Sequence, residues 1–263
     1  MNITGGTYFL NALALDYPLI EWVETAKSFC DEIILVDMGS TDGTIRAIRN
    51  RFGSTVSIIR EEWHFDKNYH EGKPRNKILE AAQMQWIYLT DADEILHEKY
   101  FDTVRYLVKG EHINFYRFGL IDFYGSCYLR RQSKSEKPAL IRNGIGFYFG
   151  PVSGKVDKSA HTLLVGGKMA RKWQPNRKIG EALYHYGRCR SARGIAAAHK
   201  FYTLQAQARQ GLSVDLNACF EEKDHIISEP NLKDNIFVRW TDGHPKVMQK
   251  WVKKHWKIHG WEA

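Results

Sequence analysis

The sequence lacks several features that would mark a secreted or membrane-spanning protein. No stretch approaches about 18 uninterrupted apolar residues, so we expect no transmembrane helix. The segment Met1–Asn11 has neither a basic region nor a long apolar region, which argues against a secretory signal peptide. The four cysteines are far apart and form no Cys-x-x-Cys pair, so reduced thiols are expected and neither a zinc site nor a disulfide framework. These absences predict a cytoplasmic protein.

What the chain does contain is an ordinary globular composition with an uneven charge. Of its 263 residues, 43% are hydrophobic and 13% aromatic, which is enough to bury a core and argues against disorder. The formal net charge is +8. Residues 1–100 carry 10 Lys and Arg against 16 Asp and Glu, whereas residues 101–263 carry 28 against 14. The basic second part predicts an anionic partner, such as a phosphate, a nucleic acid or a membrane surface.

Up to residue 100, short apolar segments alternate with segments of helical periodicity. Strands are expected at Thr7–Leu15, Glu32–Asp37, Val56–Arg60 and Trp86–Thr90. The segments between them carry apolar residues at helical spacing, and Pro74 stands where a first helical turn tolerates proline. Such alternation predicts right-handed βαβ units and a parallel sheet. In such sheets, ligands bind beyond the carboxyl ends of the strands.

The pattern changes after residue 110. Longer, aromatic strands are expected at His112–Ile121 and Ala139–Gly150, and a helix is expected after Ser191. The chain therefore divides into two halves of one domain and a helical C-terminal extension. We assign these parts to residues 1–110, 111–211 and 212–263.

The most amphipathic segment is the predicted helix Pro245–Gly260. Trp251 and Trp256 lie on its apolar face, and its lysines avoid that face. Three interpretations of this helix stay open. In the first, which is favoured, its apolar face packs against the rest of the protein. In the second, the helix attaches peripherally to an anionic membrane. In the third, the lysines contact a nucleic-acid backbone.

The central feature of the sequence is the triplet Asp91-Ala92-Asp93, which directly follows a predicted buried strand. Side chains at positions i and i+2 of an extended segment point the same way, so Asp91 and Asp93 can converge on one cation. Paired carboxylate oxygens suit Mg²⁺ or Mn²⁺, which usually keeps positions for water and substrate phosphates. The alternative for such a triplet taken alone is an acidic loop that caps the next helix.

A second motif precedes this triplet. Ile34–Thr44 reads ILVDMGSTDGT and is separated from the triplet by two βα units. Together the two motifs resemble the family-2, GT-A-type glycosyltransferases, well over residues 5–110 and loosely over residues 111–210. Lys73–Asn76 (KPRN) and Leu183–Gly187 (LYHYG) are similar to further elements of that family. The resemblance implies a Rossmann-like mixed sheet flanked by helices.

The resemblance also implies roles for particular residues. Asp37 would hydrogen-bond the base or ribose of a nucleotide, and Arg75 would contact the nucleotide or its diphosphate. Asp91 would face the ribose and the metal, and Asp93 would ligate Mn²⁺ or Mg²⁺. His185 is either a further ligand of the metal or diphosphate, or a core histidine. A turn role for Asp37 and a solvated helix position for Arg75 are the alternatives.

On the acceptor side the chain departs from the family pattern. Relatives often carry a Val-His-Glu element near the position where this chain reads Gly150–Asp157 (GPVSGKVD). The carboxylate of that element would be a general base, which takes the proton of the acceptor hydroxyl. Asp157 is the nearest substitute, although a plain surface role is favoured for it. Asp122 and Glu181 are further candidates, so the identity of the base stays open.

The combined expectation is a metal-dependent, inverting glycosyltransferase, with inversion implied by the resemblance alone. It would move a hexosyl or pentosyl group from a nucleotide-diphosphate sugar to a hydroxyl of a glycan, a lipid-linked glycan or a modified nucleic acid such as DNA. A nucleotidyltransferase is the main alternative enzyme, but Asn11–Ala14 lacks its Gly-rich, basic signature. The third alternative is a catalytically degenerate carbohydrate- or DNA-binding module, which the two retained aspartates of the triplet disfavour.

Overall fold

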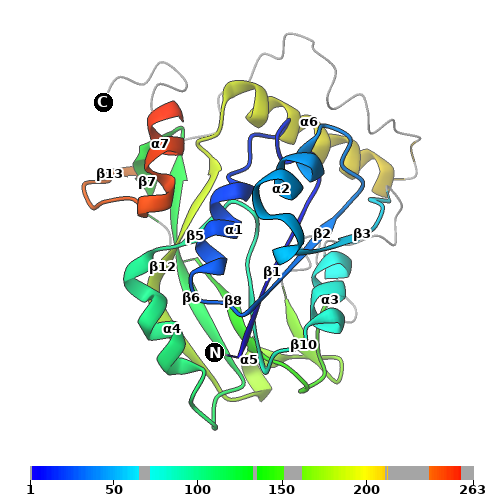
Figure 1. Cartoon of the computed structure of the whole chain (residues 1–263), viewed down its shortest axis with the longest axis vertical. Coiled ribbons are helices and arrows are strands. Elements are labelled where there is room, and N and C mark those ends of the chain that lie inside the picture. The colour runs from blue at the N-terminus through cyan, green and yellow to red at the C-terminus, as the bar shows by residue number, and fades with distance from the viewer. Residues whose placement is uncertain are drawn as a thin grey trace.

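The computed structural model describes residues 2–64, 72–132, 135–150, 162–210, 212 and 237–255 of the chain. They form a ten-stranded mixed sheet flanked by helices, and a separate three-stranded sheet (Figure 1). The strands are β1 (Ile3–Phe9), β2 (Glu32–Asp37), β3 (Ser57–Arg60), β4 (Trp86–Leu89), β5 (Glu94–Leu96), β6 (Phe115–Tyr124), β7 (Ser126–Arg131), β8 (Glu136–Arg142), β9 (Phe147–Phe149), β10 (Leu163–Val165), β11 (Lys168–Met169), β12 (Asn176–Arg188) and β13 (Phe237–Arg239). The α-helices are α1 (Leu19–Lys27), α2 (Thr44–Phe52), α3 (Gly72–Ala81), α4 (Phe101–Leu107), α5 (Ala170–Trp173), α6 (Ala192–Arg209) and α7 (Gln249–His255). This arrangement confirms the predicted α/β class, a mixed sheet flanked by helices.

The first four strands make the parallel half of the main sheet. β1 lies between β2 and β4, and β3 pairs with the outer side of β2. The apolar run Glu32–Asp37 is continuous because β2 is covered on both faces, and all but its first residue are buried. Since parallel strands end at the same edge of a sheet, the carboxyl ends of β1, β2 and β4 lie close together.

The antiparallel half begins at the other side of β4. β4 pairs with β8, β8 with β6, and β6 with β7, all antiparallel. β12 runs parallel to β6 and antiparallel to the short β5, which follows directly on the turn that contains Asp91 and Asp93. This double pairing brings a strand from the second half of the chain beside the acidic turn of the first half.

The first strand differs from the sequence expectation. The apolar segment Thr7–Leu15 predicts a strand, but β1 ends at Phe9 and the chain then leaves the sheet. Asn11 and Asp16 have positive φ angles of 45° and 54°, which a strand does not accommodate. Leu15 is still buried, within the loop that leads to α1. The apolar pattern here therefore reflects burial without strand pairing.

The predicted strand Ala139–Gly150 is likewise divided. The chain turns between β8 and β9, and Gly144 and Gly146 adopt φ angles of 78° and 79° in that turn. Such angles favour glycine, which has no β-carbon to clash with the backbone. β9 then belongs to the small sheet with β10, outside the main sheet. The remaining expected elements up to residue 210 are present with shifted boundaries.

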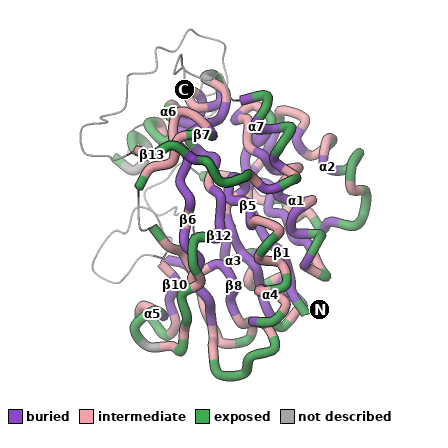
Figure 2. Tube along the Cα trace, turned by 90° about the vertical axis from the view of Figure 1, so that its left-hand side faces the viewer, coloured by how far each residue is buried: buried purple, intermediate pink, exposed green. Residues whose placement is uncertain are grey.

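The described residues of the C-terminal extension contain a helix and a strand. A 3₁₀ turn, η5 (Lys246–Met248), leads into α7 as the amphipathic pattern predicts, and Trp256 lies outside the described residues. Trp251 and Val252 are buried against the core, whereas the lysines of α7 are exposed, which supports packing of the apolar face. The sequence did not reveal β13, which extends the sheet beside β7. Buried positions lie along the central strands (Figure 2). In the described ranges, no helix has the length and apolar composition of a membrane span.

Gly6 lies where the central strand β1 passes beside α3. A β-carbon at Gly6 would lie 2.2 Å from Cγ2 of Ile78, so Gly6→Ala forces the helix or the Ile78 side chain to move. We expect the free energy of unfolding, measured by urea denaturation, to fall by about 1–3 kcal/mol. Gly180→Ala in β12 is the control, because a β-carbon there meets no described atom within 4 Å. Equal losses in both variants would contradict the close contact of β1 and α3.

Candidate functional site

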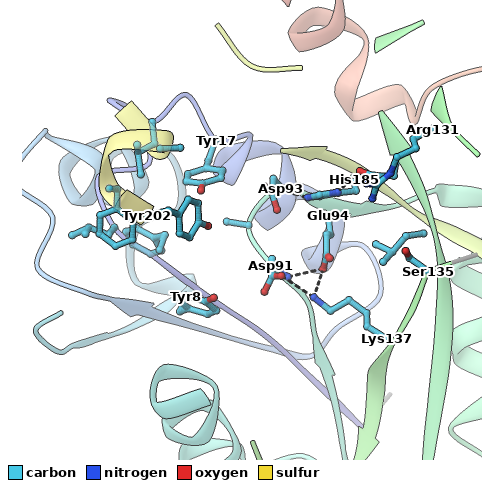
Figure 3. Close-up of a pocket in the computed structure, with 18 of the residues that line it drawn as sticks. Tyr8, Tyr17, Asp91, Asp93, Glu94, Arg131, Ser135, Lys137, His185 and Tyr202 are labelled. Carbon is cyan, nitrogen blue, oxygen red and sulfur yellow. Dashed lines mark hydrogen bonds and ion pairs between the residues drawn. The ribbon is translucent and has the colours of Figure 1, made fainter. Parts of the chain in front are cut away.

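A cavity of about 410 Å³ opens at the carboxyl ends of β1 and β4, with α6 along one side (Figure 3). This volume lies within the range of small-molecule sites. Its lining combines aromatic and charged side chains. They include Tyr8, Tyr17 and Tyr202 on one side and Asp91, Asp93, Glu94, Lys137 and His185 on the other. The acidic motif therefore faces a space large enough for a small ligand.

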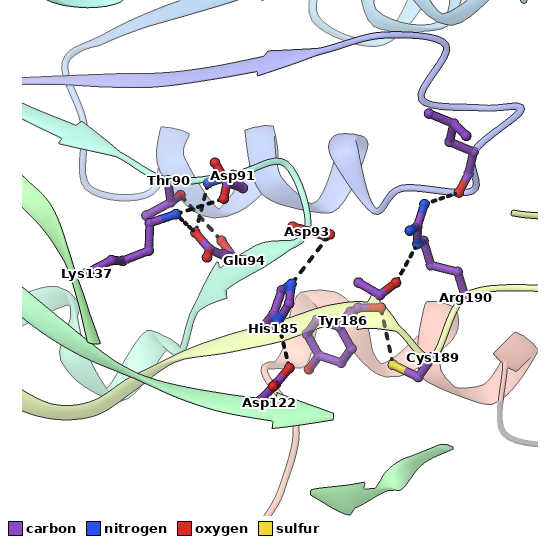
Figure 4. A network of polar contacts seen from close by, with 12 residues as sticks. Thr90, Asp91, Asp93, Glu94, Asp122, Lys137, His185, Tyr186, Cys189 and Arg190 are labelled. Atoms are coloured by element: carbon purple, nitrogen blue, oxygen red, sulfur yellow. Dashed lines mark hydrogen bonds and ion pairs between the residues drawn. The ribbon is translucent and has the colours of Figure 1, made fainter. Parts of the chain in front are cut away.

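The charged side of the cavity is organised by β12. His185 lies opposite Glu94 of β5 and Asp122 of β6 in the two strand pairings. Its Nε2 is 3.7 Å from Oδ2 of Asp93 (Figure 4). The next residue, Tyr186, donates its backbone N–H to the carbonyl oxygen of Asp93 at 2.9 Å. Main-chain bonds therefore fix the position of the His185 ring relative to Asp93.

Asp122 orients the His185 ring from behind. Nδ1 of His185 lies 2.7 Å from Oδ1 of Asp122, and the other carboxylate oxygen of Asp122 pairs with Arg131. A carboxylate that accepts the Nδ1–H bond fixes the ring and leaves Nε2 directed toward Asp93. The imidazole and the Asp93 carboxylate therefore converge on one point of the cavity.

Gly187 leaves room for this convergence. A β-carbon at Gly187 would lie 2.6 Å from Oδ2 of Asp93 and 2.7 Å from Nε2 of His185. Any larger residue would therefore crowd the two atoms that face each other. This gives a physical reason for the glycine of the LYHYG segment.

The convergent pair fits Mn²⁺ or Mg²⁺. A carboxylate oxygen and an imidazole nitrogen are ordinary Mn²⁺ ligands, and both ions commonly keep positions for water and phosphate oxygens. Asp122 supplies the outer carboxylate that often accompanies a metal-binding histidine. In the part of the chain that the structure describes, no group of three or more His, Cys, Asp or Glu side chains surrounds a common point. The side chains that would hold the ion are Asp93 and His185.

The two carboxylates also set the charge of His185. Burial lowers the pKa of the imidazole, but the negative charges and hydrogen bonds of Asp93 and Asp122 outweigh burial. The net pKa of His185 therefore lies well above its ordinary value. The two carboxylates therefore favour the protonated ring. A metal ion at Nε2 would displace the proton there, so its binding would weaken as the pH falls.

Asp91 has different surroundings from Asp93, although both belong to one triplet. Its Oδ1 lies 2.6 Å from Nη2 of Arg75, whose side chain is only 1% exposed. Its Oδ2 lies 2.9 Å from Nζ of Lys137, which is also 2.7 Å from Oε2 of Glu94. Asp91 is therefore paired with two cations, whereas Asp93 faces His185.

Lys137 was not among the sequence candidates. Burial lowers the pKa of its ammonium group, but Asp91 and Glu94 outweigh burial and leave the net pKa above the ordinary value. Lys137, with a side chain 11% exposed, thus offsets the carboxylates of Asp91 and of the buried Glu94. No motif surrounds it in the sequence. Its position follows from the pairing of β8 with β4, which the sequence pattern does not reveal.

Asp37 lies apart from this cluster, at the end of β2. It is fully buried, and its Oδ1 accepts the backbone N–H of Ser40 at 3.0 Å. Its Oδ2 has an ion-pair contact with Nε of Arg60 at 3.4 Å and no hydrogen bond within the described residues. A buried carboxylate oxygen in this state can accept a ligand N–H or O–H. Arg75, Asp91, Asp93 and His185 thus lie together, whereas Asp37 lies apart from them at the end of β2.

The candidates for the general base are placed as follows. Asp157 lies outside the described residues. Asp122 is engaged with His185 and Arg131; burial raises its pKa, but the His185 hydrogen bond and the two cations outweigh burial and lower it. Glu181 pairs with Arg130 at 2.8 Å, and its side chain is 46% exposed. Asp122 is thus an orienting group for His185, a role that the sequence did not reveal.

Asp122→Asn should lower the pKa of His185, because it removes one negative charge beside the ring. The raised folded-state pKa of His185 stabilises the protein below the unfolded-state value of about 6.5, and this stability is lost as the pH rises through the folded-state pKa. The free energy of unfolding of Asp122→Asn is therefore furthest below that of the wild type at about pH 4–6.5. The difference between the two proteins becomes smaller at higher pH.

The pKa is measured by NMR titration of the ring with a chelator present. Asp102→Asn is the control, because Asp102 is 93% exposed and pairs only with Arg105 among the ion pairs of the described residues. An unchanged His185 pKa in Asp122→Asn would contradict the assignment of the Nδ1 contact.

Known proteins were compared with the chain by sequence. Residues 19–145 match the sequence model of Glycosyl transferase family 2. A stretch of 73 residues is 40% identical to the SPbeta prophage-derived glycosyltransferase SunS of Bacillus subtilis (strain 168). It is equally similar to glycosyltransferase SunS of Bacillus phage SPbeta. The match covers 28% of this chain and 16% of SunS, so the similarity extends over only a small part of these curated relatives.

Solved structures align over most of the chain at low identity. TarS 1-349 of S. aureus aligns with 83% of this chain and 68% of its own, at 14% identity and a TM-score of 0.45. The mannosyltransferase PcManGT from Pyrobaculum calidifontis, solved with GDP-Man and Mn²⁺, aligns with 83% of this chain and 66% of its own, at 14% identity and a TM-score of 0.49. Residues 19–145 of the chain thus match Glycosyl transferase family 2, and the described residues form the mixed sheet that the resemblance to this family predicted.

Proposed function

We propose that the chain is a metal-dependent, inverting glycosyltransferase that moves a sugar from a nucleotide-diphosphate donor to an acceptor hydroxyl. The observation that carries this proposal is the approach of Asp93 Oδ2 and His185 Nε2 to 3.7 Å in a cavity of about 410 Å³. The match of residues 19–145 to Glycosyl transferase family 2 supports the reaction class, and the convergent pair supports the use of a divalent metal.

Asp37 is the proposed contact of the nucleotide base or ribose. Its buried Oδ2, which accepts no hydrogen bond within the described part of the chain, suits an N–H or hydroxyl donor of a ligand. It lies at the carboxyl end of β2, next to the end of β1 from which the cavity opens. Binding of a nucleotide there would place its diphosphate toward the acidic triplet.

Arg75 and Asp91 are proposed to act as one unit on the donor. Arg75 and Lys137 hold the two oxygens of Asp91, so the carboxylate is ionised and fixed in direction. An ionised, oriented carboxylate accepts hydrogen bonds from ribose or sugar hydroxyls. The guanidinium of Arg75 adds positive charge on the diphosphate side of the cavity.

Asp93 and His185 are the proposed ligands of Mn²⁺ or Mg²⁺, with Asp91 as a further candidate. When bound, the ion neutralises the negative charge that develops on the departing diphosphate. Asp122 keeps the His185 ring in the direction that the ion requires. Gly187 keeps the space between the two ligands open.

The reaction is a single displacement. The acceptor hydroxyl attacks the anomeric carbon on the face opposite the diphosphate, the bond to the diphosphate oxygen breaks, and the hydroxyl proton passes to a base. The sugar passes through a state with oxocarbenium character, as it does in glycoside hydrolysis. Asp157 remains our candidate for the base, since Asp122 is engaged with His185 and Glu181 with Arg130.

The proposal extends to the organisation of the chain. Residues 1–110 would bind the nucleotide sugar, residues 111–211 would complete the site and receive the acceptor, and residues 212–263 would form the C-terminal extension. The positive charge beyond residue 100 suits an anionic acceptor, with a glycan, a lipid-linked glycan and DNA as the candidates. A cytoplasmic location, with peripheral membrane contact through the lysines of α7, is part of the same proposal.

The proposal is tested by incubating the protein with a panel of UDP-, GDP- and dTDP-sugars and Mn²⁺. Release of sugar from one donor, abolished by excess chelator and restored by Mn²⁺, supports it. Exchange of pyrophosphate into a nucleoside triphosphate would point to a nucleotidyltransferase instead. Absence of any turnover and of nucleotide binding would point to a degenerate binding module.

Asp93→Asn should abolish donor turnover because it removes the charged metal ligand and keeps the shape of the side chain. The expected loss in kcat/KM exceeds the roughly 10–100-fold typical of an outer carboxylate such as Asp122. Asp102→Asn is the exposed control. Asp93→Asn should still fold without metal, with its melting temperature lowered only by the loss of the Asp93–His185 contact. Wild-type turnover in Asp93→Asn would refute the assignment of the metal ligand.

A further inference from the structure

A loop builds the wall of the cavity opposite the acidic triplet. Leu10, Leu15 and Tyr17 line the cavity and lie between the end of β1 and the start of α1. The loop contains both described non-glycine residues with positive φ, Asn11 and Asp16. A left-handed backbone at such residues is strained and persists only where surrounding contacts impose it. The shape of this wall therefore depends on the contacts of the loop.

The first half of the loop is held by the turn that follows β2. The backbone N–H of Asn11 donates to Oγ of Ser40 at 2.8 Å, and Oδ1 of Asn11 accepts the N–H of Thr41 at 2.7 Å. The N–H of Ala14 donates to Oδ2 of Asp42 at 2.8 Å. The VDMGSTDGT motif thus anchors residues 11–14.

The second half of the loop is held by Arg190 and Ser191, which directly precede α6. Nη1 of Arg190 donates to the carbonyl oxygen of Leu15 at 2.7 Å (Figure 4). Its guanidinium also lies 4.1 Å from the centre of the Tyr17 ring. The N–H of Ser191 donates to Oδ2 of Asp16 at 2.9 Å. The start of α6 therefore supports the residues that line the cavity.

A third contact comes from the C-terminal helix α7. Nε2 of His255 lies 2.6 Å from Oδ2 of Asp16, and its Nδ1 lies 2.6 Å from the carbonyl oxygen of Trp251. Lys254 adds a contact with the other oxygen of Asp16 at 3.3 Å. The His255 side chain is only 1% exposed. Both ring nitrogens of His255 therefore face oxygen acceptors.

The contact of Asp16 with His255 joins the loop after β1 to helix α7; the His255 side chain is buried and the Asp16 side chain is 15% exposed. Burial raises the pKa of Asp16, but the hydrogen bonds from His255 and Ser191 outweigh burial and hold the net pKa below its ordinary value. Loss of His255 removes one of the contacts of Asp16, and loss of the Asp16 carboxylate removes the acceptor that faces Nε2 of the buried ring. Asp16 itself has the left-handed backbone that the surrounding contacts must maintain. The pair is therefore placed to determine how firmly the second half of the loop is held.

We propose that His255 is a positioning residue of the donor cavity and acts on it through Asp16. The C-terminal extension, which lies outside the family match of residues 19–145, then helps to set the affinity for the nucleotide donor. This inference rests on the proposed function, since it requires that the cavity is the donor site. Without the pair, a smaller fraction of molecules has Leu15 and Tyr17 in the binding position. The apparent Kd of the donor rises in inverse proportion to that fraction.

A double-mutant cycle on the full chain tests this inference. His255→Gln removes the imidazole and its hydrogen bond with Asp16, and Asp16→Asn removes the carboxylate while keeping a residue that tolerates the left-handed backbone. Each variant is titrated with UDP and with GDP in the presence of Mn²⁺ by calorimetry, and its kcat and KM for the donor are measured. Lys250→Ala is the matched control, because Lys250 is exposed on the same helix.

We expect each single variant to raise Kd and donor KM by about tenfold, with kcat within about twofold of wild type. The Kd and donor KM of the double variant should be no higher than those of the single variants, because the two side chains act as one unit. Lys250→Ala should bind like the wild type. If His255→Gln does not fold, Asp16→Asn alone gives the readout from the loop side of the pair.

Three results would overturn the inference. Wild-type protein that binds neither UDP nor GDP would refute the proposed function and the inference together. If the wild type binds UDP or GDP and both single variants bind it with the same affinity, the inference is refuted while the proposed function is not. A lower melting temperature with unchanged donor KM at 20 °C would show that the pair only stabilises the fold.

Discussion

The site depends on the need to offset buried negative charge. Four carboxylates, those of Asp91, Asp93, Glu94 and Asp122, lie within or beside one small cavity, and isolated buried charges are too costly to persist. Each is paired with a cation, and the cations come from four different elements. They are Arg75 of α3, Arg131 of β7, Lys137 of β8 and His185 of β12. The antiparallel half of the sheet thus supplies most of the counter-charges of a motif that lies in the parallel half.

Local signals account for what could be predicted from the sequence. The continuous apolar run of β2 and the helical spacing that follows it identify βα units. The spacing of apolar residues within a short segment is enough to predict a strand or a helix, because each element buries one or both of its faces. The same locality places Asp37 and Asp93 at strand ends. His185 could be named only through the resemblance, as no neighbour of it in the sequence indicates a ligand.

Features that depend on contacts between distant residues could not be predicted in this way. Lys137 pairs with Asp91 because β8 lies beside β4, and Asp122 lies behind His185 because β6 lies beside β12. The extended strand expected at Thr7–Leu15 was wrong beyond Phe9 for the same reason. Burial beneath other elements produces the same apolar pattern as strand pairing, and contacts from residues 40–44, 190–191 and 255 impose the loop.

The hydrogen bond from the Tyr186 N–H to the Asp93 carbonyl has a thermodynamic consequence. It joins the backbone of Asp93 to that of Tyr186, the neighbour of His185, and so restricts the motion of Asp93 and His185 relative to each other. The protein therefore loses little conformational entropy when an ion arrives, because the ordering was completed when β12 joined β5 during folding. Much of the affinity of this pair for an ion would then be determined by the stability of the sheet.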